Sequence, residues 1–525
     1  MTGILRGALS VSAATVLSRV TGYGRVMAQA AVLGAGAVAD AFTVAWLLPS
    51  LIYELFLGGI LYSIFIPVLV ERMTNHGEED AKRLTNALFT VVLPLMACVA
   101  LLGIVFARPL VVLATDWGAQ NLSAAEAAEA RDLATFFFRI FALQMLFYGL
   151  NTIGTGVLQA HRHFFLPTFA PVLNNLLIIA SFVAYGALVD TNRTAAVWTL
   201  AVGVSVGVAV MALALVPTML ALGYKPRPQL GHPALAPTAR LAGPMVVLVA
   251  ASVGFQAFGT FLATRFGAAA DLTYAFTIFS LPYGIFVVAI ATALMPDLSE
   301  KHARGDLEGY RSALSFGLRT MSFVVIPSMV GMIALSTPIV GLLYGYGEFG
   351  AEDSATVAAL LVAYSVGLLG YSAYFLLVRA FYARQNTKTP AVLNVAIFAF
   401  YAAVAYALSR IFEAVGIALA LSAVYTVLAI LGLWAMRRET KRLEGRRLLV
   451  SLTKALVAGA AMYAVAYGGT SLLGMGSGAL DRLAIITVVG TASLITYLAV
   501  AYALKAEELS PAVTLLKRRL SRAGG

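Results

Sequence analysis

The sequence has few charged residues and a single cysteine. Only 12% of its 525 residues are charged, while 60% are hydrophobic, and an ordinary soluble domain has roughly 25% charged residues. The mean hydropathy is +0.88. The lone Cys98 excludes an intrachain disulfide and a cysteine-based metal cluster. This composition excludes an ordinary soluble protein and predicts an all-α polytopic membrane protein.

The sequence also lacks the motifs of an enzyme or of an ATP-driven pump. His161 and His163 have no carboxylate or cysteine partners at metal-ligand spacing, and the stretch GYGEFG (Gly345–Gly350) has no following Lys-Ser/Thr. No basic patch with interleaved aromatic residues indicates nucleic-acid binding, although the net charge is +11. We therefore predict a protein that is not an enzyme and has no cofactor, no metal site and no nucleic-acid partner.

Apolar runs long enough to cross a hydrocarbon core of about 30 Å recur along the whole chain. Arg19 and Arg25 interrupt the first run, which favours a retained helix over a cleaved leader. We predict about 14 transmembrane helices, at residues 8–33, 41–70, 84–108, 132–158, 165–189, 196–222, 240–262, 272–296, 311–335, 355–382, 389–409, 414–436, 448–470 and 480–504.

Most of the lysines and arginines fall in alternate loops and at both ends of the chain, as cytoplasmic segments do. This distribution predicts a multi-pass protein of the bacterial plasma membrane with both termini in the cytoplasm. The most basic loop, RRETKRLEGRR (Arg437–Arg447), reads as a strong positive-inside anchor or, alternatively, as a docking surface for other proteins.

Two segments of the chain resemble each other. Leu33–Glu71 and Phe266–Glu300 share the pattern [LF]GA, AFT, LP and P-x-L-x-E, with Pro49 aligned to Pro282. An offset of six helices predicts a parallel repeat, although small residues recur in any membrane helix and the likeness could be chance. We predict two six-helix lobes, 1–225 and 226–436, followed by two additional C-terminal helices and a basic tail in 437–525, with the two prolines as hinges.

Few charges fall inside the predicted helices, where each costs at least about 2.5–3.5 kcal/mol and usually faces a bundle interior or a water-filled cavity. Arg19 and Glu54 lie near mid-depth of the first and second helices, and Asp40 lies at the outer mouth of the second. The other such residues are Arg25, Arg139, Arg319 and Arg379. We expect Arg319 and Arg379, which are nearer the cytoplasmic ends, to extend toward the interface.

The stretch SRVTGYGRV places Gly22 and Gly24 between Arg19 and Arg25. Six helical positions correspond to about 240° of rotation, so the arginines of an ideal helix point apart. The two glycines permit a bend that turns both guanidinium groups into one cavity. A guanidinium stays protonated and offers a planar fork of donors that suits phosphate, so the pair predicts a diphosphate site.

The two acidic residues allow another interpretation of these arginines. Arg19 pairs with Glu54, and Arg25 with Asp40, as structural ion pairs. Both interpretations hold together if each describes a different conformation.

The chain resembles the MurJ/MviN family of lipid II flippases in the stretches SRVTGYGRV, GAGAVADAF, LLPSLIYELFLGGILYSIFIPVLVE, GVLQAHRHFFLPTFAPVLNN, LPYGIFVVAIATALMPDLSE and VRAFYARQNTKTP. The likeness spans the first eleven predicted helices. The family belongs to the multidrug/oligosaccharidyl-lipid/polysaccharide exporter superfamily, whose two-lobed members alternate between inward-open and outward-open states.

The resemblance implies a cargo. Lipid II, an undecaprenyl diphosphate bearing a disaccharide-pentapeptide, would be carried from the cytoplasmic to the outer leaflet. The family's essential arginines of the first helix match Arg19 and Arg25, and its aspartate of the second helix matches Asp40; we add Glu54 to this substrate-binding set. The expected partners are lipid II, membrane lipids, and envelope-synthesis or division proteins.

The sequence departs from many members of the family. Tyr53-Glu54 stands where they have an arginine pair, and Phe276-Thr277 and Ser280 replace charged residues of the eighth helix. In this the chain resembles an actinobacterial-type branch, and Arg19 and Arg25 carry more of any diphosphate contact. The seventh and eleventh predicted helices have no Asp or Glu, so the sequence gives no support for sodium coupling.

Three functions remain open at this stage. A lipid II flippase fits the paired arginines. The second is a related exporter, either of another polyprenyl-diphosphate-linked glycan or of small cationic drugs, although a drug exporter would favour acids in the cavity and no paired arginines. The third is a non-transporting membrane scaffold for envelope synthesis.

Overall fold

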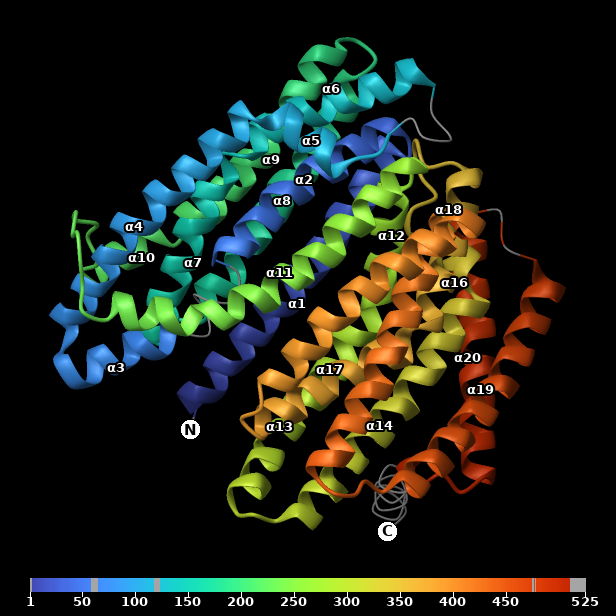
Figure 1. Cartoon of the computed structure of the whole chain (residues 1–525). Helices are drawn as coiled ribbons and strands as arrows, with labels where there is room; N and C mark the ends of the chain where they lie inside the picture. The colour runs from blue at the N-terminus through green and yellow to red at the C-terminus, as the bar shows by residue number, and fades with distance from the viewer. Residues whose placement is uncertain (1, 58–64, 118–122, 475, 477, 510–525) are drawn as a thin grey trace. The chain divides into compact units, whose positions relative to one another are not determined.

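The computed structural model describes residues 2–57, 65–117, 123–474, 476 and 478–509 (Figure 1). These residues are predominantly helical and contain no β-strand, which confirms the predicted all-α class. The chain forms two compact units. Unit 1 comprises Met1–Ala270 and Tyr346–Phe349, and unit 2 comprises Asp271–Gly345 and Gly350–Gly525. The predicted lobe boundary at 225/226 stays a prediction.

The helices follow one another with short connections. Those of unit 1 are α1 (Thr2–Leu33), α2 (Ala37–Leu57), α3 (Ile66–His76), α4 (Glu78–Val105), α5 (Ala107–Ala114), α6 (Ala124–Phe141), α7 (Gln144–Ala160), α8 (Phe165–Leu188), α9 (Arg193–Leu213), α10 (Val216–Ala221) and α11 (Leu235–Arg265). After α12 (Ala269–Pro282), which begins at the end of unit 1, unit 2 holds the π-helix η2 (Tyr283–Val287), α13 (Val288–Ala303), α14 (Leu307–Ala334), α15 (Ser336–Leu343), α16 (Ala351–Val366), α17 (Leu368–Ala383), α18 (Lys388–Glu439), α19 (Gly445–Leu473), α20 (Ala479–Ala503) and the 3-10 turn η3 (Glu507–Leu509).

Ten helices among the described residues are long and apolar enough to cross a membrane, and the bent pair α16 and α17, which meet at 47°, makes up to eleven. The sequence predicts about 14. Part of the difference is α18, which counts once although its backbone leaves the helical region at Glu413, with φ 51° and ψ −133°. An unbroken helix of its 52 residues would be about 78 Å long, far more than a core of about 30 Å requires.

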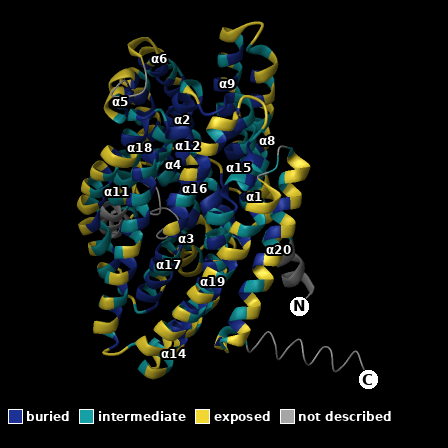
Figure 2. Cartoon of the chain, turned by 90° about the vertical axis from the view of Figure 1, so that its right-hand side faces the viewer, coloured by how far each residue is buried: buried dark blue, intermediate teal, exposed yellow. Residues whose placement is uncertain are grey.

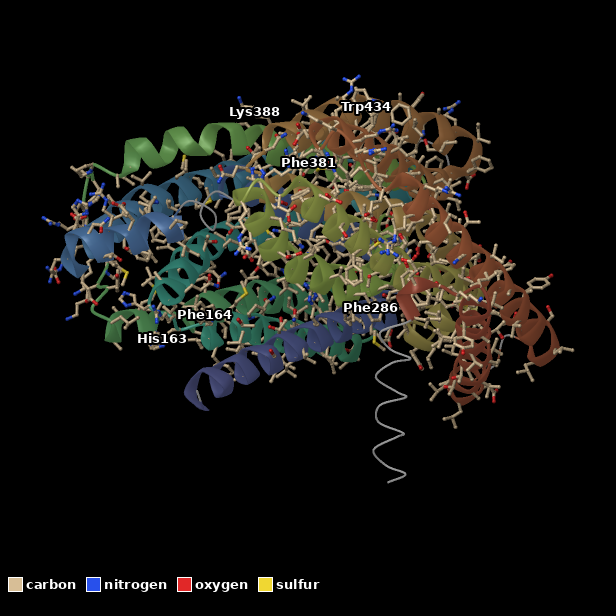
Figure 3. All side chains as sticks on the ribbon, turned by 90° about the horizontal axis from the view of Figure 1, so that it is seen from below. His163, Phe164, Phe286, Phe381, Lys388 and Trp434 are labelled. Atoms are coloured by element: carbon tan, nitrogen blue, oxygen red, sulfur yellow. The ribbon has the colours of Figure 1, made fainter. Side chains whose placement is uncertain are left out.

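Apolar side chains are exposed along many of these helices, as expected for a surface that lipid covers. Single helices alternate between buried and exposed residues along their length (Figure 2). Phe164, Phe286 and Trp434 are 47%, 41% and 52% exposed, whereas Phe381 is fully buried (Figure 3). Cys98, on α4, is also exposed.

Small residues allow neighbouring helices to approach closely. A Cβ atom added to Gly203 of α9 would lie 2.1 Å from the Ser181 hydroxyl oxygen of α8, and one added to Gly207 would lie 2.9 Å from Asn174 Oδ1. The two glycines are four residues apart, which is the small-xxx-small spacing of packed membrane helices. Any larger side chain at either position would push α8 and α9 apart.

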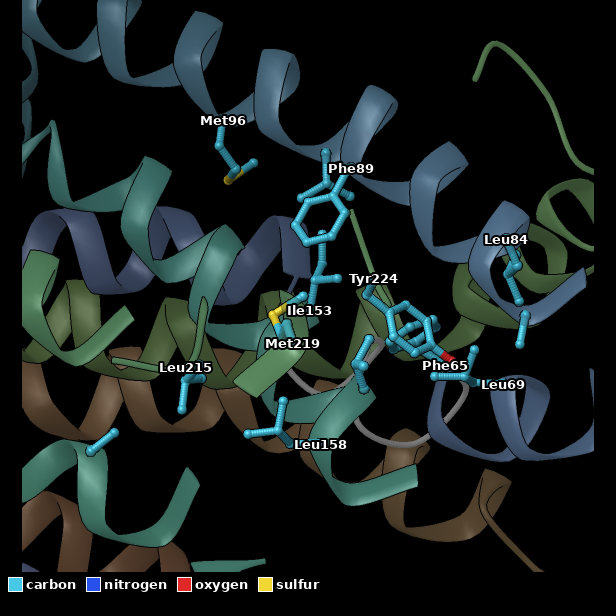
Figure 4. Packing of buried hydrophobic residues seen from close by; sticks show 14 of the residues in the cluster. Phe65, Leu69, Leu84, Phe89, Met96, Ile153, Leu158, Leu215, Met219 and Tyr224 are labelled. Atoms are coloured by element: carbon cyan, nitrogen blue, oxygen red, sulfur yellow. The ribbon is translucent and has the colours of Figure 1, made fainter. Parts of the chain in front are cut away.

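An apolar core joins α3, α4, α7 and α10 within unit 1. Phe65, Leu69, Phe89, Ile153 and Met219 are among its buried members (Figure 4).

His161 and Tyr224 lie at the edge of this core. His161 Nε2 and the Tyr224 hydroxyl are 2.9 Å apart. Burial raises the pKa of Tyr224 to about 12 and lowers the pKa of His161, so both groups are neutral at pH 7. His161 is therefore part of the packing, and the described residues contain no group of three His, Cys, Asp or Glu able to hold a metal ion.

The GYGEFG stretch makes a backbone contact within unit 1. The Glu348 N–H donates to the Ala31 carbonyl at 2.9 Å. Gly347 has φ +62°, and a Cβ atom there would lie 2.1 Å from the same carbonyl oxygen. The loop therefore needs glycine for both its conformation and its close approach to the end of α1.

Candidate functional site

Helix α1 carries both arginines of the predicted diphosphate site, Arg19 and Arg25. It runs from Thr2 to Leu33 as one helix. Gly22 and Gly24 lie inside it without positive φ, and a Cβ atom at either would come no closer than 3.6 Å to a neighbour. Neither packing nor backbone conformation therefore requires glycine at these two positions.

Helix α8 holds α1 through one amide side chain. Asn175 Nδ2 donates to the Ser18 carbonyl at 3.3 Å and to Thr21 Oγ1 at 3.2 Å. Because Asn175 is buried, this polar contact fixes the rotation of α1 one turn away from Arg25.

Arg25 lies over an aromatic ring. Its guanidinium carbon is 5.0 Å from the centroid of the Trp46 ring of α2, and the phenol of Tyr148 is close enough to interact with its charge. Trp46 itself packs edge-on against Phe141, with ring centroids 6.1 Å apart. A cation above an aromatic face gains about 0.5–2 kcal/mol. The indole thus supports the guanidinium without neutralising it.

Arg19 and Glu54 are also without a charged partner in the described part of the chain. Arg19 is exposed, and the Glu54 carboxylate on α2 is half-buried. Among the described residues, neither Arg19 nor Arg25 forms an ion pair with an acidic side chain. The ion pairs Arg19–Glu54 and Arg25–Asp40 are therefore not formed in this conformation.

Asp40 has a different partner. The residue is 1% exposed, and its Oδ1 accepts a hydrogen bond of 2.8 Å from the Ala270 N–H, at the start of α12. The buried Trp117 side chain also interacts with this carboxylate. A carboxylate at the first turn of a helix is favoured by the unsatisfied N–H groups there. Asp40 thus ties the beginning of α2 to the last residues of unit 1.

The loop before α6 reinforces this end of unit 1. The Asp116 N–H donates to Thr264 Oγ1 at 2.9 Å, and the Asp116 carboxylate lies 3.9 Å from the Arg265 guanidinium. Arg131 donates to the carbonyl of Trp117. These contacts hold Trp117 in place beside Asp40.

The two prolines predicted as hinges lie in helices of different regularity. Pro49 is inside α2, which is helical on both sides of it. Pro282 ends α12 and is followed directly by η2, a single π-helical turn that leads into α13. A π-turn inside a helix is a common mark of a functional irregularity.

Arg319 is buried and paired with acidic side chains, and its predicted extension toward the interface stays a prediction. It is 6% exposed, and it donates to Glu507 at 2.8 Å and to Glu508 at 3.0 Å. Both carboxylates follow α20, and no pattern in the sequence indicates that they meet α14. A buried arginine is stabilised by carboxylates because they supply both charge and hydrogen bonds.

Arg379 and Arg139, in contrast, are exposed. The Arg379 guanidinium lies 5.1 Å from the Phe375 ring centroid. It lines a cavity of about 360 Å³ together with Thr292 and Ser299 of α13.

Three residues of this region leave no signal in the sequence. Trp46, Tyr148 and Asn175 support α1, yet an aromatic or an amide in an apolar helix is too common to stand out. Their spacing carries no signal, because they come from α2, α7 and α8.

Comparisons with known proteins agree on one family. The family model described as "Lipid II flippase MurJ" matches residues 29–489. The chain is 31% identical to the lipid II flippase MurJ of Burkholderia cenocepacia over 75% of this chain and 76% of that protein. It is 30% identical to the probable lipid II flippase MurJ of Vibrio cholerae over 83% of this chain and 85% of that protein.

Solved structures agree on the fold. A structure of the lipid II flippase MurJ in an inward closed conformation superimposes with a TM-score of 0.74 at 23% identity, over 94% of this chain and 97% of that one. An inward-facing multidrug resistance transporter of the MATE family, in the MOP superfamily, gives 0.64 at 17% identity, over 80% and 94%. The superposition on the MurJ structure covers nearly the whole of both chains, and the family model covers most of this chain. The chain therefore belongs to the lipid II flippase MurJ family.

Proposed function

We propose that this protein carries lipid II from the cytoplasmic to the outer leaflet of the plasma membrane by alternating access. The observation that carries the proposal is the state of α1. Its two guanidinium groups, Arg19 and Arg25, have no carboxylate partner among the described residues, although an intramembrane charge normally has one. A diphosphate would supply the missing negative charge and suits a planar fork of donors.

The same proposal assigns roles to the other residues of the predicted set. Asp40 and Glu54 hold the arginines when the site is empty, in a conformation other than this one. Gly22 and Gly24 allow α1 to bend, and the absence of any packing need for glycine at either position supports that role. Pro282 beside a π-turn supports bending there, with Pro49 as its counterpart in α2.

We also propose 14 transmembrane helices in two six-helix lobes, 1–225 and 226–436, with two more in 437–525. Three helical segments support this number beyond the eleven that the length and hydropathy criteria find. They are α1, with 32 residues, α11, with 31, and the half of α18 beyond Glu413. An even number of crossings, with the basic loops inside, puts both termini in the cytoplasm.

The proposal is tested by lipid II binding to the purified full chain and to Arg19→Ala and Arg25→Ala variants. Undecaprenyl phosphate and an unrelated glycolipid serve as competing ligands. Arg139→Ala is a matched control, because Arg139 is an exposed arginine of a membrane helix outside α1. We expect both α1 variants, but not the control, to lose selective binding of lipid II.

Three results would overturn parts of the proposal. Unchanged binding in both α1 variants would mean that the arginines do not hold the cargo. Equal binding of lipid II and other undecaprenyl-diphosphate glycans would favour a less selective exporter. Selective binding without transfer between leaflets in vesicles would favour a scaffold.

A further inference from the structure

Unit 2 contains a second cluster of basic side chains, far along the chain from the arginines of α1. A cavity of about 310 Å³ is lined by Arg319 of α14, by Arg446, Arg447 and Lys454 of α19, and by Glu507 and Glu508 of η3. We call it the C-terminal basic pocket. Four cations and two carboxylates leave it with a net positive charge.

The carboxylates of the pocket are already engaged. Glu507 accepts from Arg319 at 2.8 Å and from the Arg447 Nη2 at 2.8 Å. Glu508 accepts from Arg319 at 3.0 Å and from the Ser451 hydroxyl at 2.9 Å. Arg447 has Glu444 as a further acidic neighbour, at 3.6 Å.

Two cations of the pocket are therefore not neutralised. Lys454 donates to the neutral carbonyl of Lys505 at 3.0 Å. Arg446 is exposed, and within the described ranges neither side chain has an acidic partner within 4.0 Å. Their charges are available to an anion that enters the pocket.

The pocket also contains a buried donor without an acceptor. Arg319 is 6% exposed, and its Nε makes no hydrogen bond although it is shielded from solvent. A buried donor without a partner costs about 1–3 kcal/mol or more when it is charged. In addition, Arg446 and Arg447 lie in the first turn of α19, where backbone N–H groups have no acceptor within the helix and favour an anion.

The position of the pocket indicates where the anion comes from. Its side chains lie in the first turns of α19 and just after α20, at one end of two candidate membrane spans. Next to it, α19 exposes a row of apolar side chains. Leu449, Val450, Leu456 and Val457 are 44–64% exposed, and the i, i+7 spacing puts the pairs 449/456 and 450/457 on one face. A charged group in the pocket would thus have apolar chains beside it.

From this arrangement we propose that the C-terminal basic pocket binds the phosphate of an anionic glycerophospholipid such as phosphatidylglycerol, whose acyl chains lie along the exposed apolar face of α19. Basic pockets between membrane helices at the interface have the chemistry that such headgroups require. No described residue of α1 lines the pocket, and the proposal does not rest on the transport of lipid II.

The test uses the purified full chain in detergent, titrated with phosphatidylglycerol or with zwitterionic phosphatidylcholine, and native mass spectrometry to count bound lipids. The test variant is Arg446→Gln with Lys454→Gln, which leaves the ion pairs of Arg319 and Arg447 intact. The control is Arg437→Gln with Arg442→Gln, which removes the same charge from exposed positions outside the pocket. We expect a preference for phosphatidylglycerol of at least tenfold that the test variant loses and the control keeps.

The other outcomes would overturn the proposal. Equal binding of the two lipids to the unmodified chain, or equal loss in both double variants, would mean that no specific pocket exists. Displacement by inorganic phosphate or glycerol 3-phosphate at equal concentration would identify a site for soluble anions. Displacement by equimolar lipid II would assign the pocket to the cargo. Arg25→Ala separates the two proposals, because it should keep the lipid preference.

Discussion

Arg25 in unit 1 and Arg319 in unit 2 both interrupt apolar helices, yet their surroundings differ. Arg319 is buried against two carboxylates of its own chain, at 2.8 and 3.0 Å. Arg25 lies on the Trp46 ring, 5.0 Å away, and has no acidic partner among the described residues. The chain supplies the counter-ion of Arg319 and, among its described residues, none for Arg25.

If Arg25 binds the cargo as proposed, the difference separates a structural charge from a binding charge. A buried ion pair is hard to break because removal of one partner leaves the other desolvated and alone. Removal of a guanidinium that lies over an aromatic ring should cost the fold little stability, because no unpaired opposite charge is left behind. Substitutions of the two residues should therefore affect different measurements.

The largest expected effect on stability comes from Arg319→Met. Glu508 is 4% exposed, and without Arg319 its charge would be buried and unpaired. The free energy of unfolding should fall by about 3–5 kcal/mol, measured by thermal unfolding in detergent. Arg319→Met combined with Glu508→Leu should restore part of this loss. A single variant as stable as the unmodified chain would contradict the structural role.

Arg25→Met should show the reverse pattern. The melting temperature should change little, whereas lipid II binding should weaken about tenfold to hundredfold, because a charge-assisted hydrogen bond contributes roughly 1.5–3 kcal/mol. Thermal unfolding and binding are measured on the same preparation. If stability fell as far as in Arg319→Met, the distinction between the two arginines would fail.

Two substitutions test whether Asp40 has a structural role or a role in cargo binding. Asp40→Asn keeps an acceptor for the Ala270 N–H, so its effect on unfolding should stay below about 1 kcal/mol, whereas Asp40→Ala leaves that donor unpaired and should cost about 1–3 kcal/mol. Both are measured by thermal unfolding. A loss of lipid II binding in Asp40→Asn at normal stability would instead make Asp40 part of the cargo site.

The smallest effect concerns pH. The hydrogen bond from Arg447 lowers the pKa of Glu507, which is 54% exposed. A carboxyl group with a lowered pKa stabilises the fold above its usual pKa, about 4.3, and this contribution is lost as pH falls through the lowered value. Glu507→Gln should therefore melt slightly below the unmodified chain at pH 7, with the gap closing below about pH 4. A difference in melting temperature that persists below about pH 4 would mean that Glu507 stabilises the fold through packing and not through its charge.

The all-helical fold and the arginines of α1 could be predicted because each leaves a local signal. Apolar runs of about 20 residues are visible in the sequence, and Arg19 and Arg25 stand out within one of them. The partners of Arg319 could not be predicted, because Glu507 and Glu508 lie 188 and 189 residues away. Beyond the last span they look like ordinary polar residues.

The contact of Asp40 and the number of helices likewise depend on features that the sequence does not display. The partner of Asp40, Ala270, is 230 residues away and offers a backbone N–H, which no sequence pattern reveals. The sequence placed separate helices on either side of Glu413. Two helices join across a kink at this residue, so a count by length takes them as one element.

The exposed Cys98 on α4 has a practical consequence. Because the chain has a single cysteine, a thiol-reactive fluorophore or spin label would attach to unit 1 at one known position. One engineered cysteine in unit 2 would carry the second label. The Cys98→Ala variant, which has no cysteine, would serve as the unlabelled control. The distance distribution between the two labels, with and without lipid II, would then test whether the two units move relative to each other.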